Sequence, residues 1–217
     1  MAPTDLSNSM PSQPYLDEQS FTIALTWLAK QDPDLSSILE RWGPPPMWAR
    51  DPGFPTLIHI ILEQQVSLAS ARAAFNRLLE AVFPLTPEGF LSLDDADLKK
   101  IGFSRQKTTY GRILAQTIID GVLDFDRLHA ADDETARAML IRIKGIGNWT
   151  ADIYLLMALR RPDIWPRGDL ALLNAVQQVK GLPNRPTTEE MDRISSAWQP
   201  WRAVAARCFW HDYLSRI

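Results

Sequence analysis

Apolar residues recur every three to four positions along most of this chain, with polar residues between them. That spacing is typical of helices that bury one face. No segment shows a convincing alternation of apolar and polar residues, and no Asn-Gly pair joins two such segments into a hairpin. The pattern therefore predicts an all-α fold.

Capping residues divide the pattern into separate helices. A proline opens one helix that Gly43 closes, Ser104 precedes another, and Thr187 and Glu190 have the spacing of a capping box. We expect helices at residues 21–30, 34–42, 95–101, 132–143, 169–179 and 201–214, and others that begin near residues 56, 67, 104, 148 and 187.

A short glycine-containing turn, Lys144-Gly145-Ile146-Gly147, separates two of these helices, and we expect Asn148 to cap the second. Alternate glycines indicate positive φ angles or the close approach of another chain. Free N–H groups at the second helix, with Arg142 and Lys144 nearby, suit a phosphate. An ordinary turn between helices with a glycine cap is the alternative reading.

The composition sets limits on the class of protein. The chain has 217 residues, is 46% hydrophobic and carries a formal net charge of −3, so it is large enough for one domain or two small lobes. The charge is uneven, because residues 1–51 carry a net −4 and residues 141–185 a net +4. A lone Cys208 excludes a disulfide framework and a four-cysteine zinc or iron–sulfur cluster within this chain.

The N-terminal segment has neither the basic start nor the apolar centre of a signal peptide, and no apolar run is long enough to cross a membrane. We expect residues 1–20 to form a disordered tail. We also expect a cytoplasmic, bacterial-type protein associated with the nucleoid, with no membrane partner.

The motif KGIGNWTADIYLL followed by PRGD resembles the signature of the helix-hairpin-helix DNA glycosylase superfamily. Within it, the chain is most similar to the compact form of the 3-methyladenine DNA glycosylase II group, over residues 21–214. The resemblance implies two helical lobes with the active-site cleft between them. Residues 21–52 plus 166–217 would form a discontinuous lobe, and residues 53–165 a central lobe with the helix-hairpin-helix at about 132–159.

The resemblance also assigns catalysis to Asp169. A carboxylate at a helix start is often only an N-cap, but capping and catalysis are compatible. A fixed negative charge near the sugar stabilises the positive charge that develops when a base is cut from deoxyribose. Asp152, which we expect on the polar side of its helix, and Asp163, in a loop, lack the family position.

Aromatic residues are implied to bind the damaged base. Trp149 and Trp210 take the positions that line the family's base pocket, and aromatic faces favour electron-poor alkylated purines. Trp149 also stands where glycosylases that cut the DNA strand carry a Schiff-base lysine, which implies a monofunctional enzyme. Ile153 replaces a family tyrosine, so the substrate range stays open.

Contacts to DNA follow by position. The family inserts a side chain into the gap left by the extruded base, and here that wedge would be Gln65, with Gln64 beside it. A solvated helix end is the alternative for this polar break. The hairpin positions that would contact phosphate are Lys144, Gly145, Gly147, Asn148 and Thr150, and backbone carbonyls of Ile141, Ile143 and Ile146 would hold a monovalent cation such as Na⁺ or K⁺.

These features predict a monomeric, monofunctional DNA glycosylase that needs no cofactor and excises alkylated bases from double-stranded DNA. A non-catalytic helix-hairpin-helix DNA-binding module is the main alternative, and a bifunctional glycosylase-lyase is disfavoured by Trp149. Asp169 discriminates between the first two, because a binding module needs no carboxylate facing phosphate. The preferred base, among 3-methyladenine, 7-methylguanine, ethenoadenine, hypoxanthine and 1-methyladenine, is left open.

Overall fold

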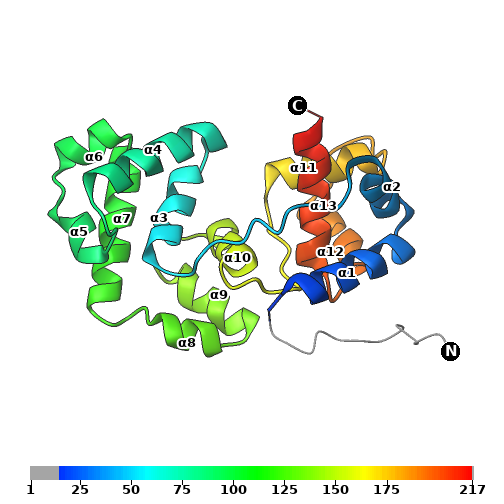
Figure 1. The fold of residues 1–217 in the computed structure, drawn as a ribbon, viewed down its shortest axis with the longest axis horizontal. Coiled ribbons are helices and arrows are strands. Elements are labelled where there is room, and N and C mark those ends of the chain that lie inside the picture. The colour runs from blue at the N-terminus through cyan, green and yellow to red at the C-terminus, as the bar shows by residue number, and fades with distance from the viewer. Residues whose placement is uncertain (1–14, 217) are drawn as a thin grey trace. The chain divides into compact units, whose positions relative to one another are not determined.

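The computed structural model describes residues 15–216, and every regular element within them is a helix (Figure 1). The predicted all-α fold is therefore confirmed. Contacts between residues divide the chain into two compact units. The terminal unit takes the chain up to Trp48 and again from Arg160 on, and the central unit runs from Ala49 to Leu159.

The terminal unit is built around α13, which packs against α1, α2 and α11. Residues 203–210 of α13 are all buried, as expected for a helix enclosed on every side. The described helices of this unit are α1 (Glu18–Gln31), α2 (Pro33–Trp42), α11 (Leu170–Val179), α12 (Thr188–Ser196) and α13 (Arg202–Ser215).

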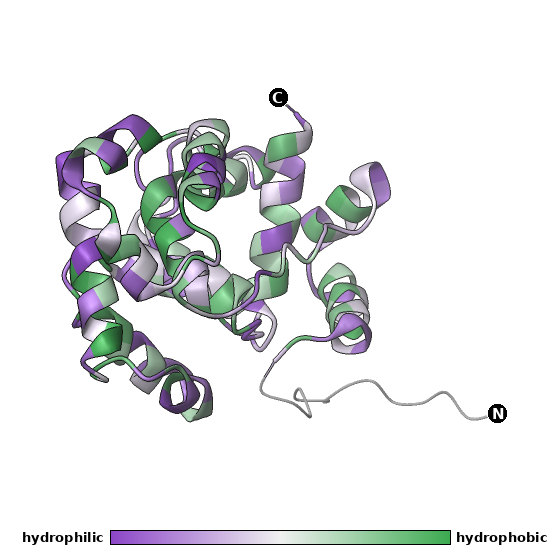
Figure 2. Ribbon diagram, turned by 60° about the vertical axis from the view of Figure 1, so that its left-hand side comes forward, coloured by the Kyte–Doolittle hydropathy of each residue, from purple (hydrophilic) through white to green (hydrophobic). Residues whose placement is uncertain are grey.

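The central unit is organised around α3, which packs against α4, α7 and α10. Its residues 56–58 and 60–63 are buried, whereas most other helices interleave hydrophobic and hydrophilic positions (Figure 2). The helices are α3 (Phe54–Glu63), α4 (Leu68–Ala81), α5 (Pro87–Ser92), α6 (Asp95–Ile101), α7 (Arg105–Ile119), α8 (Phe125–Ala130), α9 (Asp133–Ile141) and α10 (Asn148–Met157).

The central unit begins at Ala49 and the second part of the terminal unit at Arg160. The sequence analysis placed these two boundaries slightly later, at residues 53 and 166. Side-chain contacts explain the second shift. The Trp165 ring lies 5.3 Å from that of Trp198, and Asp163 forms an ion pair with Arg202 at 2.8 Å. Because these partners belong to the terminal unit, the loop before Asp169 belongs to it as well.

The predicted disordered tail at residues 1–20 is wrong at its end. Leu16 is fully buried, and its N–H donates to the carbonyl of Arg160 at 2.7 Å. Asp17 caps α1 through a reciprocal capping box with Ser20. Burial of an apolar side chain and a satisfied cap order this part of the chain. Residues 1–14 of the predicted tail lie outside the described residues.

Three of the predicted caps stand at helix ends. Gly43 ends α2, Ser104 accepts from the N–H of Lys107 at the start of α7, and Thr187 and Glu190 form the capping box of α12. Two short helices, α5 and α8, were not predicted. Each has six residues, which is too short for a helical period to show in the sequence.

Candidate functional site

The hairpin between α9 and α10 turns its apolar residues inward and its polar residues outward. Ile143 and Ile146 are buried, and the N–H of Ile146 donates to the carbonyl of Ile143 at 3.0 Å. Lys144 and Gly147 are exposed. Gly147 is the N-cap of α10, which has no side-chain cap hydrogen bond. The first N–H groups of α10 are therefore not taken by a capping side chain, as an anion site requires.

Asn148 does not cap α10, so that prediction was wrong. It is the first residue of the helix, and the N-cap position belongs to Gly147. A side chain inside the first turn no longer has the extended backbone from which an N-cap side chain reaches back to the N–H groups. Asn148 is exposed beside these groups.

The two glycines of the hairpin are required for different reasons. Gly145 has a φ of +100°, and a Cβ there would lie 2.3 Å from Cγ of Tyr110 on α7. Gly147 has a φ of −93°, and a Cβ added to it would meet no heavy atom within 4 Å. The fold itself thus requires a glycine at position 145. In the free protein, nothing requires a glycine at position 147. Close approach of a bound molecule is the reason consistent with the sequence.

The turn between α3 and α4, residues 64–67, presents Gln65 to solvent, and we call it the wedge turn. Gln65 is exposed and has a φ of +56°, a left-handed conformation that is uncommon for residues other than glycine. The neighbouring Val66 and Leu68 are 47% and 58% exposed. An exposed polar tip in a strained conformation with apolar neighbours is suited to insertion between bases. The wedge role of Gln65 stays a prediction.

Gln64, the second predicted wedge residue, has its side-chain amide engaged within the central unit. Its Nε2 donates to the carbonyl of Gly145 at 2.9 Å and to Oγ1 of Thr150 at 3.0 Å. The amide group therefore joins the wedge turn to the hairpin within the central unit. Thr150, which is 2% exposed, accepts this hydrogen bond through its hydroxyl, and its contact with a phosphate stays a prediction.

Two cations hold the end of α3, directly before the wedge turn. Arg50 binds Glu63 through two hydrogen bonds of 2.7 and 3.0 Å. Lys107 Nζ donates to the carbonyl of Leu62 at 2.7 Å, and burial lowers the pKa of this lysine. A cation at the C-terminal carbonyls of a helix is favourable. No local pattern in the sequence revealed this internal role of Lys107.

Asp169, the predicted catalytic carboxylate, lies at the start of a helix. It is the N-cap of α11, and its Oδ1 accepts from the N–H of Leu172 at 2.8 Å. The Nε1–H of Trp210 donates to the same oxygen at 3.3 Å. Asp169 is 9% exposed, and Gly168 before it has a φ of +78°. A carboxylate held by a helix N-terminus and an indole is fixed in direction, as electrostatic catalysis requires.

The rival carboxylates are committed to ion pairs. Asp152 is 1% exposed and binds Arg137 at 2.6 Å, so its predicted place on the polar side of the helix was wrong. Asp163 binds Arg202. A buried acid paired with an arginine has a structural role, because breaking the pair would leave an uncompensated charge.

Trp210 carries an aromatic neighbour that the sequence analysis did not assign to the site. The ring of Trp48 lies 6.5 Å from that of Trp210, at an interplanar angle of 77°. The signal in the sequence was an aromatic residue inside a proline-rich linker, where no helix face explains it. Trp149 belongs to the central unit and is partly buried. Its place in one pocket with Trp210 stays a prediction.

Ile153 and Tyr154 follow Trp149 on α10, and both are buried. Ile153 is 3% exposed, and Tyr154 is fully buried. The phenol oxygen of Tyr154 accepts from the N–H of Gly53 at 2.9 Å, and burial raises its pKa. Tyr154 therefore braces the start of α3 and does not replace the tyrosine that the resembling family carries at Ile153.

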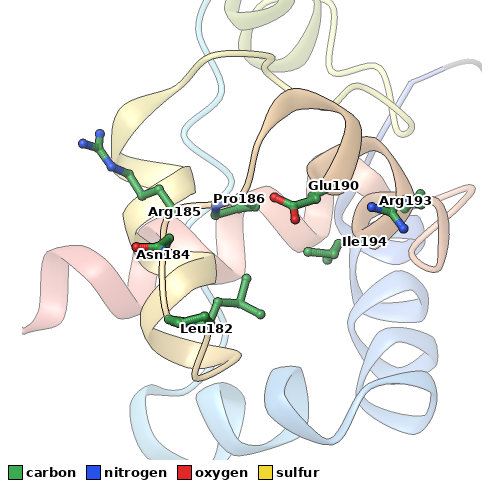
Figure 3. Close-up of a pocket in the computed structure, with 8 residues that line it drawn as sticks. Leu182, Asn184, Arg185, Pro186, Glu190, Arg193 and Ile194 are labelled. Carbon is green, nitrogen blue, oxygen red and sulfur yellow. The ribbon is translucent and has the colours of Figure 1, made fainter.

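An open groove in the terminal unit lies beside α12 (Figure 3). In Figure 3 the Arg185 side chain points away from Glu190, and Glu190 is engaged in the capping box with Thr187 at 2.8 Å. None of the predicted site residues lines it, and we assign it no role. The lining residues are Leu182, Pro183, Asn184, Arg185, Pro186, Glu190, Arg193 and Ile194.

Among residues 15–216, no group of three or more His, Cys, Asp or Glu side chains is placed to hold a metal ion. A monovalent cation on backbone carbonyls of Ile141, Ile143 and Ile146 would need no such group, and it stays a prediction. One of these carbonyls, that of Ile143, already accepts the N–H of Ile146. In the described part of the chain, no helix has the length and apolar character needed to cross a membrane.

Comparisons with known proteins show what this chain is similar to. The family model of the HhH-GPD superfamily base excision DNA repair proteins matches residues 58–200. The chain is 29% identical over 187 residues to the putative DNA-3-methyladenine glycosylase YfjP of Bacillus subtilis, covering 82% of this chain and 65% of that protein, just under two thirds. It is 28% identical over 210 residues to DNA-3-methyladenine glycosylase 1 of Schizosaccharomyces pombe, covering 90% and 92%.

A solved structure shows the same fold. The 3-methyladenine DNA glycosylase of Schizosaccharomyces pombe, in complex with abasic DNA, superposes with a TM-score of 0.76 at 26% identity. The match covers 86% of this chain and 94% of that one.

Proposed function

This chain belongs to the HhH-GPD superfamily of base excision DNA repair proteins, and from that membership we propose that it is a monofunctional DNA glycosylase for alkylated bases. The observation that carries the proposal is Asp169, a carboxylate fixed by the N-terminus of α11 and by the Trp210 indole. The relatives named as DNA-3-methyladenine glycosylases support the substrate class. We propose 3-methyladenine and 7-methylguanine in double-stranded DNA as its substrates, bound by a monomer.

The reaction breaks the bond between C1′ of deoxyribose and the base nitrogen. The bonding electrons leave with the base, and an alkylated purine that is cationic at the ring departs as a neutral molecule. The Asp169 carboxylate opposes the positive charge that develops on the sugar. Water then adds its oxygen to C1′ and passes its proton to Asp169 or to solvent, which yields an abasic site and the free base.

Trp149 supports hydrolysis by water over attack by an amine. A glycosylase that also cuts the strand needs a lysine at the sugar to form a Schiff base, and position 149 holds an indole. The product of the proposed reaction is therefore an intact strand with an abasic site. The hairpin supports binding to the DNA backbone, because α10 presents N–H groups without a side-chain cap beside the exposed Lys144.

Release of free base from a panel of duplexes, each with one modified base, tests the proposal. Wild-type protein should release alkylated purines and leave the strand uncut until the abasic site is cleaved chemically. Asp169→Asn keeps an oxygen that can cap α11, so its stability should stay close to wild type, while base release falls by about 10²-fold or more. Binding of the duplex should change far less. Duplex binding without release of any base by wild-type protein would favour the non-catalytic DNA-binding module.

A further inference from the structure

Trp48 adopts a backbone conformation that is unfavourable for a tryptophan. Its φ is +49°, in the left-handed region that bulky residues rarely occupy. The indole is partly buried and packs edge-on against Trp210 and against His211, with ring centroids 6.5 and 6.4 Å apart. Strain of this kind persists only where the surroundings impose it.

Arg207 supplies that restraint from inside α13. Its side chain is fully buried, its Nε–H donates to the carbonyl of Met47 at 2.7 Å, and its Nη1–H donates to the carbonyl of Ala203 at 2.9 Å. The Met47 carbonyl belongs to the peptide bond that enters Trp48. The guanidinium therefore fixes the plane of the peptide bond from which the strained tryptophan begins.

Burial of a guanidinium group is energetically unfavourable, even when it donates to backbone carbonyls. Burial lowers the pKa of Arg207 to about 9, so the group stays protonated at neutral pH. Desolvation opposes the burial of an ion, and apolar replacements of buried charged groups are often neutral or stabilising. Stability alone thus gives little reason for an arginine here, whereas a requirement for one defined conformation of the linker does.

The contacts continue from Trp48 to the catalytic carboxylate. The ring of Trp48 stands nearly perpendicular to that of Trp210, which limits rotation of the Trp210 indole. The Nε1–H of Trp210 donates to Oδ1 of Asp169 at 3.3 Å, a long bond whose strength depends on the direction of the N–H. A change in the orientation of the indole would therefore alter the hydrogen bonding of the carboxylate.

We propose that Arg207 and Trp48 are positioning residues, which act through Trp210 to set the orientation of the Asp169 carboxylate. This inference rests on the proposed function, because it takes Asp169 as the catalytic group. Neither residue needs to touch the DNA for the effect. Catalysis depends strongly on such orientation, since misplacement of a group by about 1 Å costs up to about 10²-fold in rate.

Arg207→Leu and Trp48→Ala test the proposal by two measurements. The first is the ¹H–¹⁵N resonance of the Trp210 indole N–H, assigned by its disappearance in Trp210→Phe. The second is the rate of base release under single-turnover conditions, with affinity for an abasic duplex measured separately. We expect both variants to shift the Trp210 resonance and to slow release by about tenfold, while the affinity changes less than about twofold. Trp48→Phe should restore most of the rate.

Lys180→Met is the matched control. Lys180 donates to Asp32 at 2.6 Å, and Trp198 donates to the same carboxylate at 2.8 Å. This cluster belongs to the terminal unit, but its hydrogen bonds involve neither Trp48 nor Trp210. The variant should lower the melting temperature and move the Trp198 indole resonance, yet leave the Trp210 resonance and the rate of base release unchanged. Loss of stability alone is thereby separated from loss of orientation.

The outcomes distinguish the two proposals. Folded Arg207→Leu and Trp48→Ala proteins with a wild-type Trp210 resonance and wild-type rates would overturn the positioning role. If Arg207→Leu does not fold, the partly exposed Trp48 still provides the test. Absence of base release by wild-type protein would refute the glycosylase proposal instead, and the Trp210 resonance would still decide whether Arg207 and Trp48 set its orientation.

Discussion

Gly145→Ala imposes two independent penalties on the hairpin. The φ of +100° at this position costs a residue with a Cβ about 1–2 kcal/mol. The new Cβ would also lie 2.3 Å from Cγ and 2.6 Å from Cβ of Tyr110, and forced overlap in a packed interior costs about 1–3 kcal/mol. Tyr110 cannot simply turn aside, because its own Cβ is among the overlapped atoms and its hydroxyl is hydrogen-bonded to Gln106 at 2.6 Å.

The sum predicts a loss of about 2–5 kcal/mol in the free energy of unfolding. For a chain of this size, that corresponds to a fall in melting temperature of about 5–15 °C. Gly147→Ala is the matched control, because Gly147 has a φ of −93° and open space around its Cα. It should cost at most about 1 kcal/mol, since alanine is a poorer N-cap than glycine.

Thermal and urea unfolding of both variants measure these losses, and binding to undamaged and damaged duplexes completes the comparison. Gly147→Ala should lower the affinity for undamaged and damaged duplexes to a similar degree, because a Cβ there obstructs the approach of a phosphate to α10. A melting temperature for Gly145→Ala equal to that of wild type would refute the steric reasoning. If Gly147→Ala lowered only the affinity for damaged DNA, the hairpin would take part in base recognition and not in phosphate binding.

Gln65→Ala should slow base release from duplex DNA and reduce the signal of a fluorescent base analogue at the lesion, with a smaller effect when the lesion lies opposite a gap; equal signals and rates would make Gln65 a solvated helix end. Gln64→Glu cannot donate to both the Gly145 carbonyl and Thr150, so it should lose about 1–3 kcal/mol in urea unfolding; unchanged stability would contradict the role of this amide. Burial raises the pKa of Asp32, but hydrogen bonds from Lys180 and Trp198 outweigh it, so the net pKa lies below its ordinary 3.8. The stability due to Asp32 should therefore be present above pH 3.8 and be lost as the pH falls through the folded-state pKa, and this acid loss, followed by urea unfolding, should be smaller in Lys180→Met.

Local features of the sequence predicted most of the helices and several of their caps. Ser104, Asp169 and Thr187 each cap a helix by accepting an N–H three residues ahead, which is a relation a linear pattern contains. The glycine at position 145 was likewise identified by its turn. Asn148 was misplaced by one position, because the sequence does not show which residue of a turn keeps an extended backbone.

Contacts between distant residues could not be read in the same way. The hydrogen bond from Gln64 to Gly145 spans 81 positions, and the one from Arg207 to Met47 spans 160. No residue pattern near Asp152 predicted its burial against Arg137. A local pattern records which residues share a helix face, but a partner on another helix is selected only when the helices pack. The sequence by itself therefore determined most of the helices, the hairpin and the position of Asp169. Only the tertiary structure decided that Gln64 braces the wedge turn and that Trp48 packs against Trp210, the indole that donates to Asp169, because both depend on chain segments brought together by burial of apolar surface.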